Sequence, residues 1–425
     1  MKLKSISITN FRGIEELNLE LDSNLNIIIG DNGSGKTAVL EAINLAIGSL
    51  FVGIQHVPVS TVKQEQIRIL PNQEYALPLK VTSSGLFNDR HIEWTRNKES
   101  INGGAQTRKS NIFKEIGATL QDNVRQNKEV ILPVIASYSS LRNNAFIKPR
   151  KLESLIRKPK GIGSRFRGYI GSLNALADLE YFNYWFISKE LSQMQRKEKD
   201  DSFEVVKNII IKSIPDCSDV FYDFNPDINR GVSLKFNDGR ILPFNFLSDG
   251  LRSFFALISD LAWRYAKLNP HLGATVFENT PGIVLIDELD LHLHPKWQKT
   301  VLNKLLENFP KTQFIVTTHS PFLIQEASMN QLIVLDNCSL SRIQGASDLS
   351  IEDIAEFLQK IEMPQWSNKK TELYNSAKGY LSAISKGDKI NNEDKNKLSK
   401  LLKPFSMNPA FDALLEQERI KNSKD

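Results

Sequence analysis

A glycine-rich segment constrains the fold of this 425-residue chain more than any other feature. The segment Gly30-Asp31-Asn32-Gly33-Ser34-Gly35-Lys36-Thr37 fits the pattern G-x-x-x-x-G-K-[S/T]. The apolar run Leu25–Ile29 precedes it and predicts a buried strand, and Thr37–Ile47 predicts the helix that follows. Glycine lets such a loop turn its N–H groups inward, and a helix N-terminus attracts anions. This strand, loop and helix therefore predict a phosphate-binding site.

The loop side chains have distinct roles if the phosphates belong to a nucleoside triphosphate. We expect Lys36 to reach the β- and γ-phosphates and the Thr37 hydroxyl to ligate Mg²⁺. The expected ligands are thus ATP and Mg²⁺. The residues of this loop expected to contact the nucleotide are Asn32, Gly33, Ser34, Gly35, Lys36 and Thr37.

A second block lies far downstream, where the apolar run Ile283–Ile286 ends in Asp287 and Glu288. Such a run predicts a strand buried on both faces, which delivers two carboxylates to the sheet edge where ligands bind. We expect Asp287 to hold Mg²⁺, directly or through water. Glu288 is expected to orient and polarise the water that attacks the γ-phosphate. Together the two blocks predict an ATPase that produces ADP and phosphate.

Two further segments extend this site. Leu247-Ser248-Asp249-Gly250 precedes an amphipathic stretch, Leu251–Lys267, so Ser248 and Gly250 are expected at a helix N-terminus, where anions bind. The run Gln313–Thr317 predicts a strand that ends shortly before His319. We expect His319 to reach the γ-phosphate and count it, with Glu288, among the catalytic residues.

The order of these motifs resembles the ATP-binding-cassette (ABC) ATPase heads of the SMC, RecF and OLD (overcoming lysogenisation defect) group. The resemblance covers roughly residues 1 to 335. The opening Ile8–Gly13 is similar to RecF-like heads, and Asp287–Pro295 is similar to OLD-like and PtuA-like antiphage ATPases of Septu and retron systems. It implies an α/β fold: an ABC-ATPase head with a phosphate loop, a mixed sheet, an antiparallel β subdomain and a helical lobe, plus a small α-helical tail.

The resemblance also implies a site shared between two chains in a homodimer or a higher oligomer. Ser248 and Gly250 of one subunit would contact the γ-phosphate held in the other by Lys36, Asp287, Glu288 and His319. Asp290 would lie at the interface. The family usually has glycine where this chain has Asp249, and we expect that side chain to point away from the nucleotide.

A second departure concerns the glutamine that the family places after a core strand. Ile131–Ser137 is expected to be that strand, but no glutamine follows it. Gln64 and Gln66 are earlier candidates, and the sequence does not choose between them.

We expect four regions. Their bounds are 1–137 for an N-terminal ATPase lobe, 138–247 for a helical lobe with a β-hairpin, 248–345 for a C-terminal ATPase lobe, and 346–425 for an α-helical tail. Within the first, residues 51–128 are expected to form an inserted antiparallel region, with a hairpin of Leu77–Thr82 and His91–Thr95 across Ser84-Gly85. In the second, Asn237-Asp238-Gly239 predicts a hairpin turn between Val232–Phe236 and Ile241–Phe246.

The sequence pattern of the tail predicts three helices, Ile351–Ile361, Lys369–Ser385 and Asn408–Arg419. It contains no Asp-x-Asp pair and is too short for the TOPRIM nuclease of OLD-type enzymes. Any DNA cleavage would therefore need a separate effector, such as an HNH nuclease. No sustained heptads occur, which excludes the long coiled coil of SMC-type proteins.

A basic segment follows the core strand, although the formal net charge of the chain is only +5. Residues 142–167 contain nine Lys or Arg and one acidic residue, Glu153. Such a segment can track a nucleic-acid backbone. It can equally be a solvated loop, with Arg142 or Arg165 turned toward the nucleotide.

The apolar runs and the cysteines of the sequence indicate the cellular compartment of the protein. No run of 18 apolar residues occurs, and the opening residues lack the apolar core of a signal peptide. Cys217 and Cys338 have no metal-ligand spacing and suit a reducing environment. We therefore expect a cytoplasmic protein without a membrane partner.

The function predicted from the sequence is a nucleotide-gated ATPase acting as sensor or regulator in an antiphage defence complex. Three alternatives remain open: a RecF-like DNA-binding clamp, the nucleotide-binding subunit of a transporter, and a scaffold that binds ATP without turnover. The RecF-like opening and the helical tail disfavour the transporter subunit.

Overall fold

The structure is a computed structural model. It describes residues 1–88, 90–101, 106–108, 111–140, 164–174, 176–225, 231–328, 330–336, 338–343, 346–362, 364–372, 374 and 375. The chain forms two compact units, Met1–Leu349 and Ser350–Asp425.

A five-stranded antiparallel sheet with the order β2-β1-β4-β5-β6 contains the N-terminal strand. Its strands are β1 (Lys2–Phe11), β2 (Ile14–Glu20), β4 (Leu79–Phe87), β5 (Arg90–Lys98) and β6 (Gln106–Arg108). The antiparallel strands expected within residues 51–128 extend the sheet begun by the N-terminal strands, because β4 pairs directly with β1. A helix, α2 (Asn111–Arg125), follows these strands.

The hairpin expected in this region exists, but its turn is displaced. β4 and β5 pair antiparallel as far as Phe87 and Arg90, so the turn lies beyond Phe87 and not at Ser84-Gly85. Gly85 instead lies inside β4, where an added Cβ would be 2.5 Å from the carbonyl oxygen of Lys2. The glycine permits close approach of two strands, which in sequence resembles a turn signal.

A six-stranded sheet with the order β14-β13-β3-β12-β11-β7 forms the second layer. Its strands are β3 (Leu25–Ile29), β7 (Val134–Tyr138), β11 (Gly282–Ile286), β12 (Thr312–Thr317), β13 (Leu332–Asp336) and β14 (Ser339–Ile343). Strands β13, β3, β12, β11 and β7 are parallel neighbours, and β14 pairs antiparallel with β13. The carboxyl ends of the parallel strands therefore meet at one edge of the sheet.

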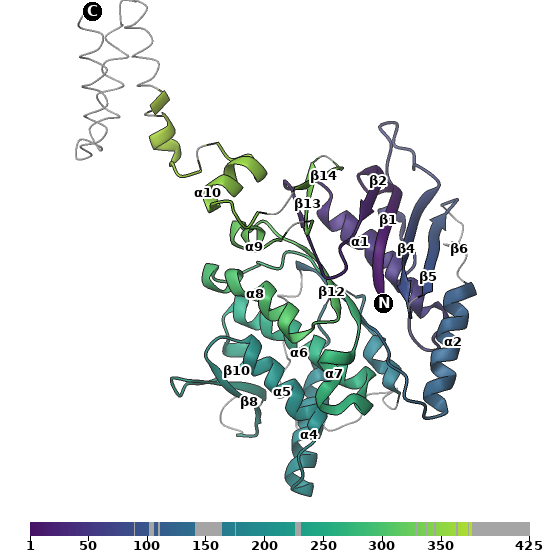
Figure 1. The fold of residues 1–425 in the computed structure, drawn as a ribbon, viewed down its shortest axis with the longest axis vertical. Helices are drawn as coiled ribbons and strands as arrows, with labels where there is room; N and C mark the ends of the chain where they lie inside the picture. The colour runs from purple at the N-terminus through teal and green to yellow at the C-terminus, as the bar shows by residue number, and fades with distance from the viewer. Residues whose placement is uncertain are drawn as a thin grey trace, which may run out of the picture. The chain divides into compact units, whose positions relative to one another are not determined.

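Helix α1 (Lys36–Ile47) lies between the two sheets, in contact with β1, β4 and β5 on one side and β12 on the other (Figure 1). Its apolar residues are buried on both sides. The segment Lys36–Gly53 is long and apolar enough to cross a membrane by length and composition, but 72% of it is buried in the fold. It is the central core helix of this unit.

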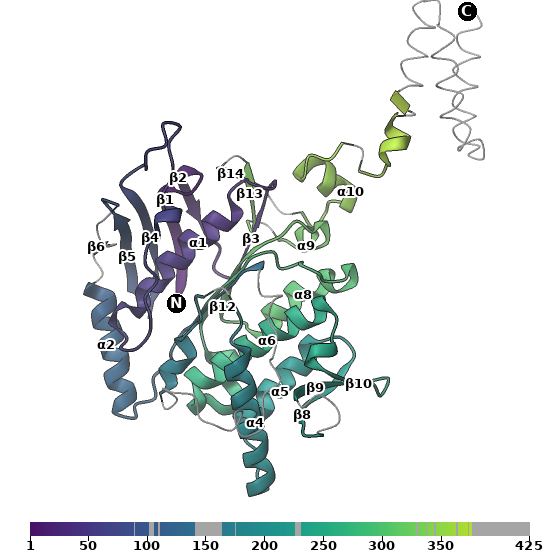
Figure 2. The ribbon, with the colours of Figure 1, turned by 180° about the vertical axis from the view of Figure 1, so that it is seen from behind.

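Helices cover the other side of the parallel sheet (Figures 1 and 2). The helices are α4 (Leu179–Arg196), α5 (Asp201–Ser213), α6 (Asp249–Leu268), α7 (Val276–Asn279), α8 (Pro295–Asn308) and α9 (Pro321–Gln325). Almost every residue of α6 is buried, and this helix contacts β7 as well as α4 and α5. The aromatic residues Tyr169, Phe182 and Phe186 are buried and belong to the core.

A small sheet, β8 (Cys217–Asp223), β9 (Gly231–Phe236) and β10 (Ile241–Pro243), joins the helices. β9 and β10 pair antiparallel around Asn237-Asp238-Gly239, which confirms the second predicted hairpin. This arrangement of a mixed sheet, an antiparallel sheet and a helical part is the fold class predicted from the sequence.

In the second unit the structure describes α10 (Ile351–Asp353), followed by a π-helical turn at Ile354–Leu358. Most of the second predicted tail helix, Lys369–Ser385, and all of the third, Asn408–Arg419, lie outside the described residues.

A buried glutamine joins the two sheets. Gln313 in β12 is fully buried; its Oε1 accepts from the backbone N–H of Leu3 in β1 at 2.8 Å. Its Nε2 donates to the carbonyl oxygens of Leu3 at 2.8 Å and Asp22 at 2.7 Å. One side chain thus satisfies three backbone groups, the two of Leu3 buried and that of Asp22 partly buried.

We expect Gln313→Leu to lower the free energy of unfolding by about 2 kcal/mol or more, because the two buried backbone groups of Leu3 lose their partner at about 1–3 kcal/mol each. Urea unfolding measures the change. Gln126→Leu, at an exposed position, is the control and should change stability by less than about 0.5 kcal/mol. Equal midpoints for the two variants would contradict this role of Gln313.

Candidate active site

The phosphate loop connects β3 to α1 and needs glycine at two positions. At Gly30, an added Cβ would lie 2.1 Å from the carbonyl oxygen of Leu335 in β13. Gly35 precedes α1 with φ +103°, a left-handed conformation that other residues resist. Both glycines let the backbone wrap tightly in front of the N-terminus of α1, the geometry that the sequence pattern predicts.

Lys36 is 8% exposed and its side chain folds back over the loop. Its Nζ donates to the carbonyl oxygens of Gly30 and Asp31, both at 2.8 Å. Burial lowers the pKa of Lys36, although Asp287, Asp31, Glu288 and Asp290 act in the opposite direction. Phosphate oxygens are stronger acceptors for an ammonium than neutral carbonyls, so the same Nζ is suited to a triphosphate.

Thr37 and Asp287 meet although 250 residues separate them in the sequence. The Thr37 hydroxyl donates to Asp287 Oδ2 at 3.1 Å, and the backbone N–H of Asp287 donates to the carbonyl oxygen of Tyr138 at 2.8 Å. These oxygens fit a magnesium ion: two neighbouring ligands of an octahedral Mg²⁺ lie about 2.9 Å apart. The glycine loop and the acidic doublet therefore form one site at the carboxyl edge of the parallel sheet.

Thr317 organises this acidic edge. The sequence motifs did not identify it as a site residue. Its hydroxyl donates to Asp287 Oδ1 at 2.5 Å and accepts from the backbone N–H of Glu288 at 2.8 Å. Glu288 has φ +49°, a left-handed conformation that is uncommon outside glycine and is often found at functional sites. The hydroxyl thus fixes the Asp287 carboxylate and supports the unusual backbone of its neighbour.

The residues around His319 form a second polar cluster. His319 follows β12, the strand between β3 and β11, so it lies at the same sheet edge as the loop and Asp287. The hydroxyl of its neighbour Thr318 donates to Asp290 Oδ1 at 2.5 Å. On the other side, the Ser320 hydroxyl donates to Gln298 Oε1 at 2.7 Å. The segment that carries His319 is therefore tied to the chain that follows Glu288.

Ser248 and Gly250 lie at the start of α6. Ser248 is exposed, and its side chain makes no capping hydrogen bond. Gly250 packs against the backbone of His292, whose carbonyl oxygen would be 2.1 Å from an added Cβ. Asp249 pairs with Arg252 at 2.5 Å, which offsets its charge. Among the described residues, no hydrogen bond joins Ser248 or Gly250 to the phosphate loop of the same chain.

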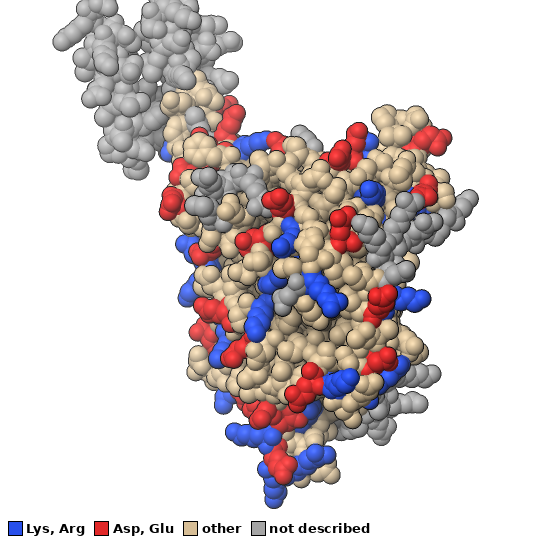
Figure 3. All heavy atoms as spheres, turned by 45° about the vertical axis from the view of Figure 1, so that its right-hand side comes forward, with Lys and Arg blue, Asp and Glu red and all other residues tan. Residues whose placement is uncertain are grey.

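The basic segment contributes little to this site where the structure describes it. Residues 141–163 lie outside the described residues. Arg165 donates to the carbonyl oxygens of Leu268 at 2.6 Å and Val130 at 2.5 Å. Val130 precedes β7, so this contact is at the sheet edge opposite Asp287. Of the two arginines considered as facing the nucleotide, Arg165 therefore does not, and Arg142 lies outside the described residues. On the face shown in Figure 3, basic and acidic side chains are interspersed.

The two glutamines considered from the sequence make local contacts. Gln66 Oε1 accepts from the backbone N–H of Lys63, and Gln64 Nε2 donates to the Tyr75 hydroxyl, both at 3.0 Å. Neither of these hydrogen bonds involves the phosphate loop.

Three adjacent parallel strands carry the site. The phosphate loop follows β3, His319 follows β12, and Asp287 and Glu288 follow β11. Together with the two-sheet architecture, they define an ABC-type ATPase of the SMC and RecF group. The chain belongs to the family described as "AAA domain, putative AbiEii toxin, Type IV TA system", whose model matches residues 25–325.

Its relatives include a probable retron ATPase and a Septu protein. The chain is 27% identical to the "Retron Vc95 probable ATPase" of Vibrio cholerae serotype O1 biovar El Tor, over 79% of this chain and 74% of that protein. It is 28% identical to the "Septu protein PtuA" of Bacillus thuringiensis, over 78% of this chain and 75% of that protein. Among solved structures, the chain is similar to an SMC head bound to the C-winged helix domain of ScpA. The match covers 81% of this chain and 98% of the SMC head, with 14% identity and a TM-score of 0.49.

Thr317→Val should raise the Mg²⁺ concentration needed for half-maximal ATP turnover about 10- to 100-fold, because residues that orient a metal ligand typically contribute that much. A titration of ATPase activity with Mg²⁺ measures this. Thr312→Val is the matched control: it removes a buried hydroxyl that contacts Tyr265 at the other end of β12. The same Mg²⁺ dependence in both variants would contradict the role of Thr317.

Proposed function

We propose that the protein hydrolyses ATP to ADP and phosphate at composite sites in a head-to-head homodimer. The contact between Thr37 and Asp287, with Glu288 beside it, carries the proposal. In it, the N–H groups of the loop and the Lys36 ammonium bind the phosphates of the nucleotide. The contacting loop residues are Asn32, Gly33, Ser34, Gly35, Lys36 and Thr37.

The magnesium ion would be held by Thr37 and Asp287, and it supplies charge stabilisation and a template for the triphosphate. Glu288 orients the attacking water and accepts its proton, and His319 contacts the γ-phosphate from the neighbouring strand. The unusual backbone of Glu288 supports this assignment, since it turns the side chain that follows Asp287 away from the path of an extended strand.

A second copy of the chain completes the site in this proposal. Ser248 and Gly250 are at the N-terminus of a 20-residue helix, a position that favours anions. The Ser248 side chain is exposed, and no hydrogen bond between described residues links it to the loop of its own chain. In an isologous dimer each chain would offer this helix N-terminus to the triphosphate held by the other.

The family and the relatives support a defence role. We place this ATPase as the sensor or regulator of an antiphage complex in the cytoplasm, as a homodimer or higher oligomer with a separate effector such as an HNH nuclease. The proposed division of labour within the chain is an N-terminal ATPase lobe (1–137), a helical lobe (138–247), a C-terminal ATPase lobe (248–345) and a helical tail (346–425). Nucleic acid as a ligand of segment 142–167 belongs to the same proposal.

Lys36→Ala is expected to abolish ATP binding, because the loop loses its cation. Glu288→Gln should keep ATP bound and slow turnover on the order of 10²- to 10⁴-fold through loss of the general base. Calorimetry and phosphate release measure the two effects. Glu278→Gln, at an exposed position outside this sheet edge, is the control. Wild-type turnover in Glu288→Gln would refute the assigned chemistry, and binding without turnover in the wild type would favour the ATP-binding scaffold.

A mixing experiment tests the shared site. Ser248→Arg and Lys36→Ala should each be inactive alone, since each spoils both sites of its homodimer. In an equal mixture, half of the dimers contain one intact site, so about a quarter of the wild-type turnover should return. Recovery is followed by phosphate release after mixing. A mixture that stays inactive speaks against sites shared between chains.

A further inference from the structure

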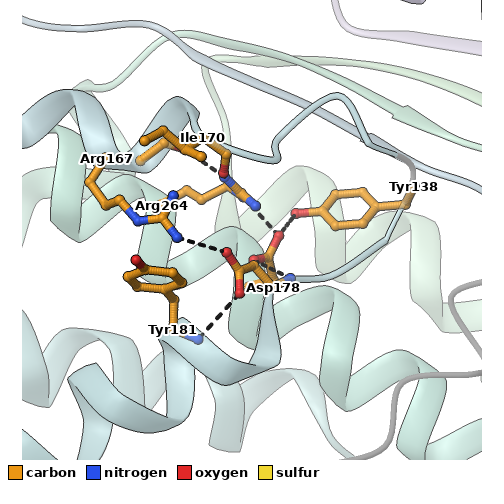
Figure 4. A network of polar contacts seen from close by, with 8 residues as sticks. Tyr138, Arg167, Ile170, Asp178, Tyr181 and Arg264 are labelled. Atoms are coloured by element: carbon orange, nitrogen blue, oxygen red, sulfur yellow. Dashed lines mark hydrogen bonds and ion pairs between the residues drawn. The ribbon is translucent and has the colours of Figure 1, made fainter. Parts of the chain in front are cut away.

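Tyr138 contacts both the acidic edge of the site and helix α6. It is the last residue of β7, and its carbonyl oxygen accepts from the backbone N–H of Asp287 at 2.8 Å. Its hydroxyl donates to Asp260 Oδ2 in the middle of α6 at 2.7 Å (Figure 4). Burial raises the pKa of Tyr138 well above its ordinary value, and the Asp260 carboxylate acts in the same direction. The hydroxyl therefore remains a donor at any physiological pH.

Asp260 and Arg264 form a fully buried ion pair on α6, with Arg264 Nε 2.8 Å from Asp260 Oδ2. Arg264 Nη1 also donates to the carbonyl oxygens of Gly168 at 2.7 Å and Ile170 at 3.1 Å. Asp260 Oδ1 accepts from the backbone N–H of Asp178, the residue that caps α4. This network, shown in Figure 4, joins α6 to residues 168–170 and to the N-terminus of α4.

The network gives α6 a defined orientation. Most of its other neighbours are apolar, and apolar contacts are not directional, whereas a hydrogen bond to a carboxylate is. Gly250 packs against His292 at the start of α6, and Asp260 lies about 15 Å further along the axis at 1.5 Å per residue. Two attachments at this separation fix the direction of the helix relative to the acidic edge.

We infer that Tyr138 is a positioning residue that couples the place of Asp287 to the orientation of α6. Through α6 it sets the position of Ser248 and Gly250, which the proposed function assigns to the triphosphate of the partner chain. Displacements of about 1 Å in a reacting geometry reduce rates by on the order of 10²-fold. The inference rests on the proposed function, because only a shared site makes the direction of α6 matter to catalysis.

Tyr138→Phe tests the inference by removing one oxygen atom. Asp260 keeps two donors, Arg264 and the N–H of Asp178, so the carboxylate stays compensated. Tyr169→Phe is the matched control: the Tyr169 hydroxyl is buried and donates to Pro133 at 2.8 Å, at the opposite end of the same strand. Thermal unfolding with and without Mg·ATP identifies a temperature at which both variants are folded and bind nucleotide.

We expect Tyr138→Phe to bind ATP within twofold of the wild-type affinity and to lower kcat at least tenfold, and Tyr169→Phe to leave both within twofold. Wild-type kcat in Tyr138→Phe, or the same loss of kcat in both variants, overturns the coupling role. A wild-type protein that neither binds nor hydrolyses ATP overturns the proposed function and the inference together. If the wild type turns ATP over and Tyr138→Phe equals it, only the inference fails.

Discussion

The contact between Thr37 and Asp287 depends on the order of the parallel strands. β12 stands between β3 and β11. The loop after β3 and the carboxylates after β11 therefore meet only if all three strands run in the same direction and their carboxyl ends are aligned. Every residue of β3, β11 and β12 is buried, and that burial holds the strands in this register. The two oxygens 3.1 Å apart are thus a consequence of sheet packing rather than of local sequence.

Two buried aspartates show how surroundings decide the use of a carboxylate. Asp287 accepts hydrogen bonds from two neutral donors, the hydroxyls of Thr37 and Thr317, at the edge of the sheet. Asp260 is paired with the Arg264 guanidinium, and neither side chain is exposed. In the proposed function the first carboxylate would hold a divalent cation, while the second is paired within the fold and fixes the position of a helix.

The sequence predicted those parts of the structure whose signals are local. Apolar runs located β3, β11 and β12, and the glycine pattern located the loop between β3 and α1. The turn near Gly85 was misplaced because a glycine required for strand approach looks like a turn glycine. The alternative that turned Arg165 toward the nucleotide was wrong, because the partners of Arg165 are backbone carbonyls, which have no sequence signature. Thr317 and Tyr138 were missed for a related reason: their partners lie 30 and 122 residues away.

The attachments of α6 have a further consequence in the proposed dimer. The helix is fastened to the acidic edge of its own chain, through Gly250 against His292 and through Tyr138, yet its N-terminus would complete the site of the other chain. A change at one Asp287 would therefore alter the contacts offered to the opposite triphosphate. Because the two-fold axis repeats the arrangement, each site would act on the other through identical contacts. Coupling of this kind would need no additional element, since the helix proposed to complete one site is anchored beside the acidic edge of its own chain.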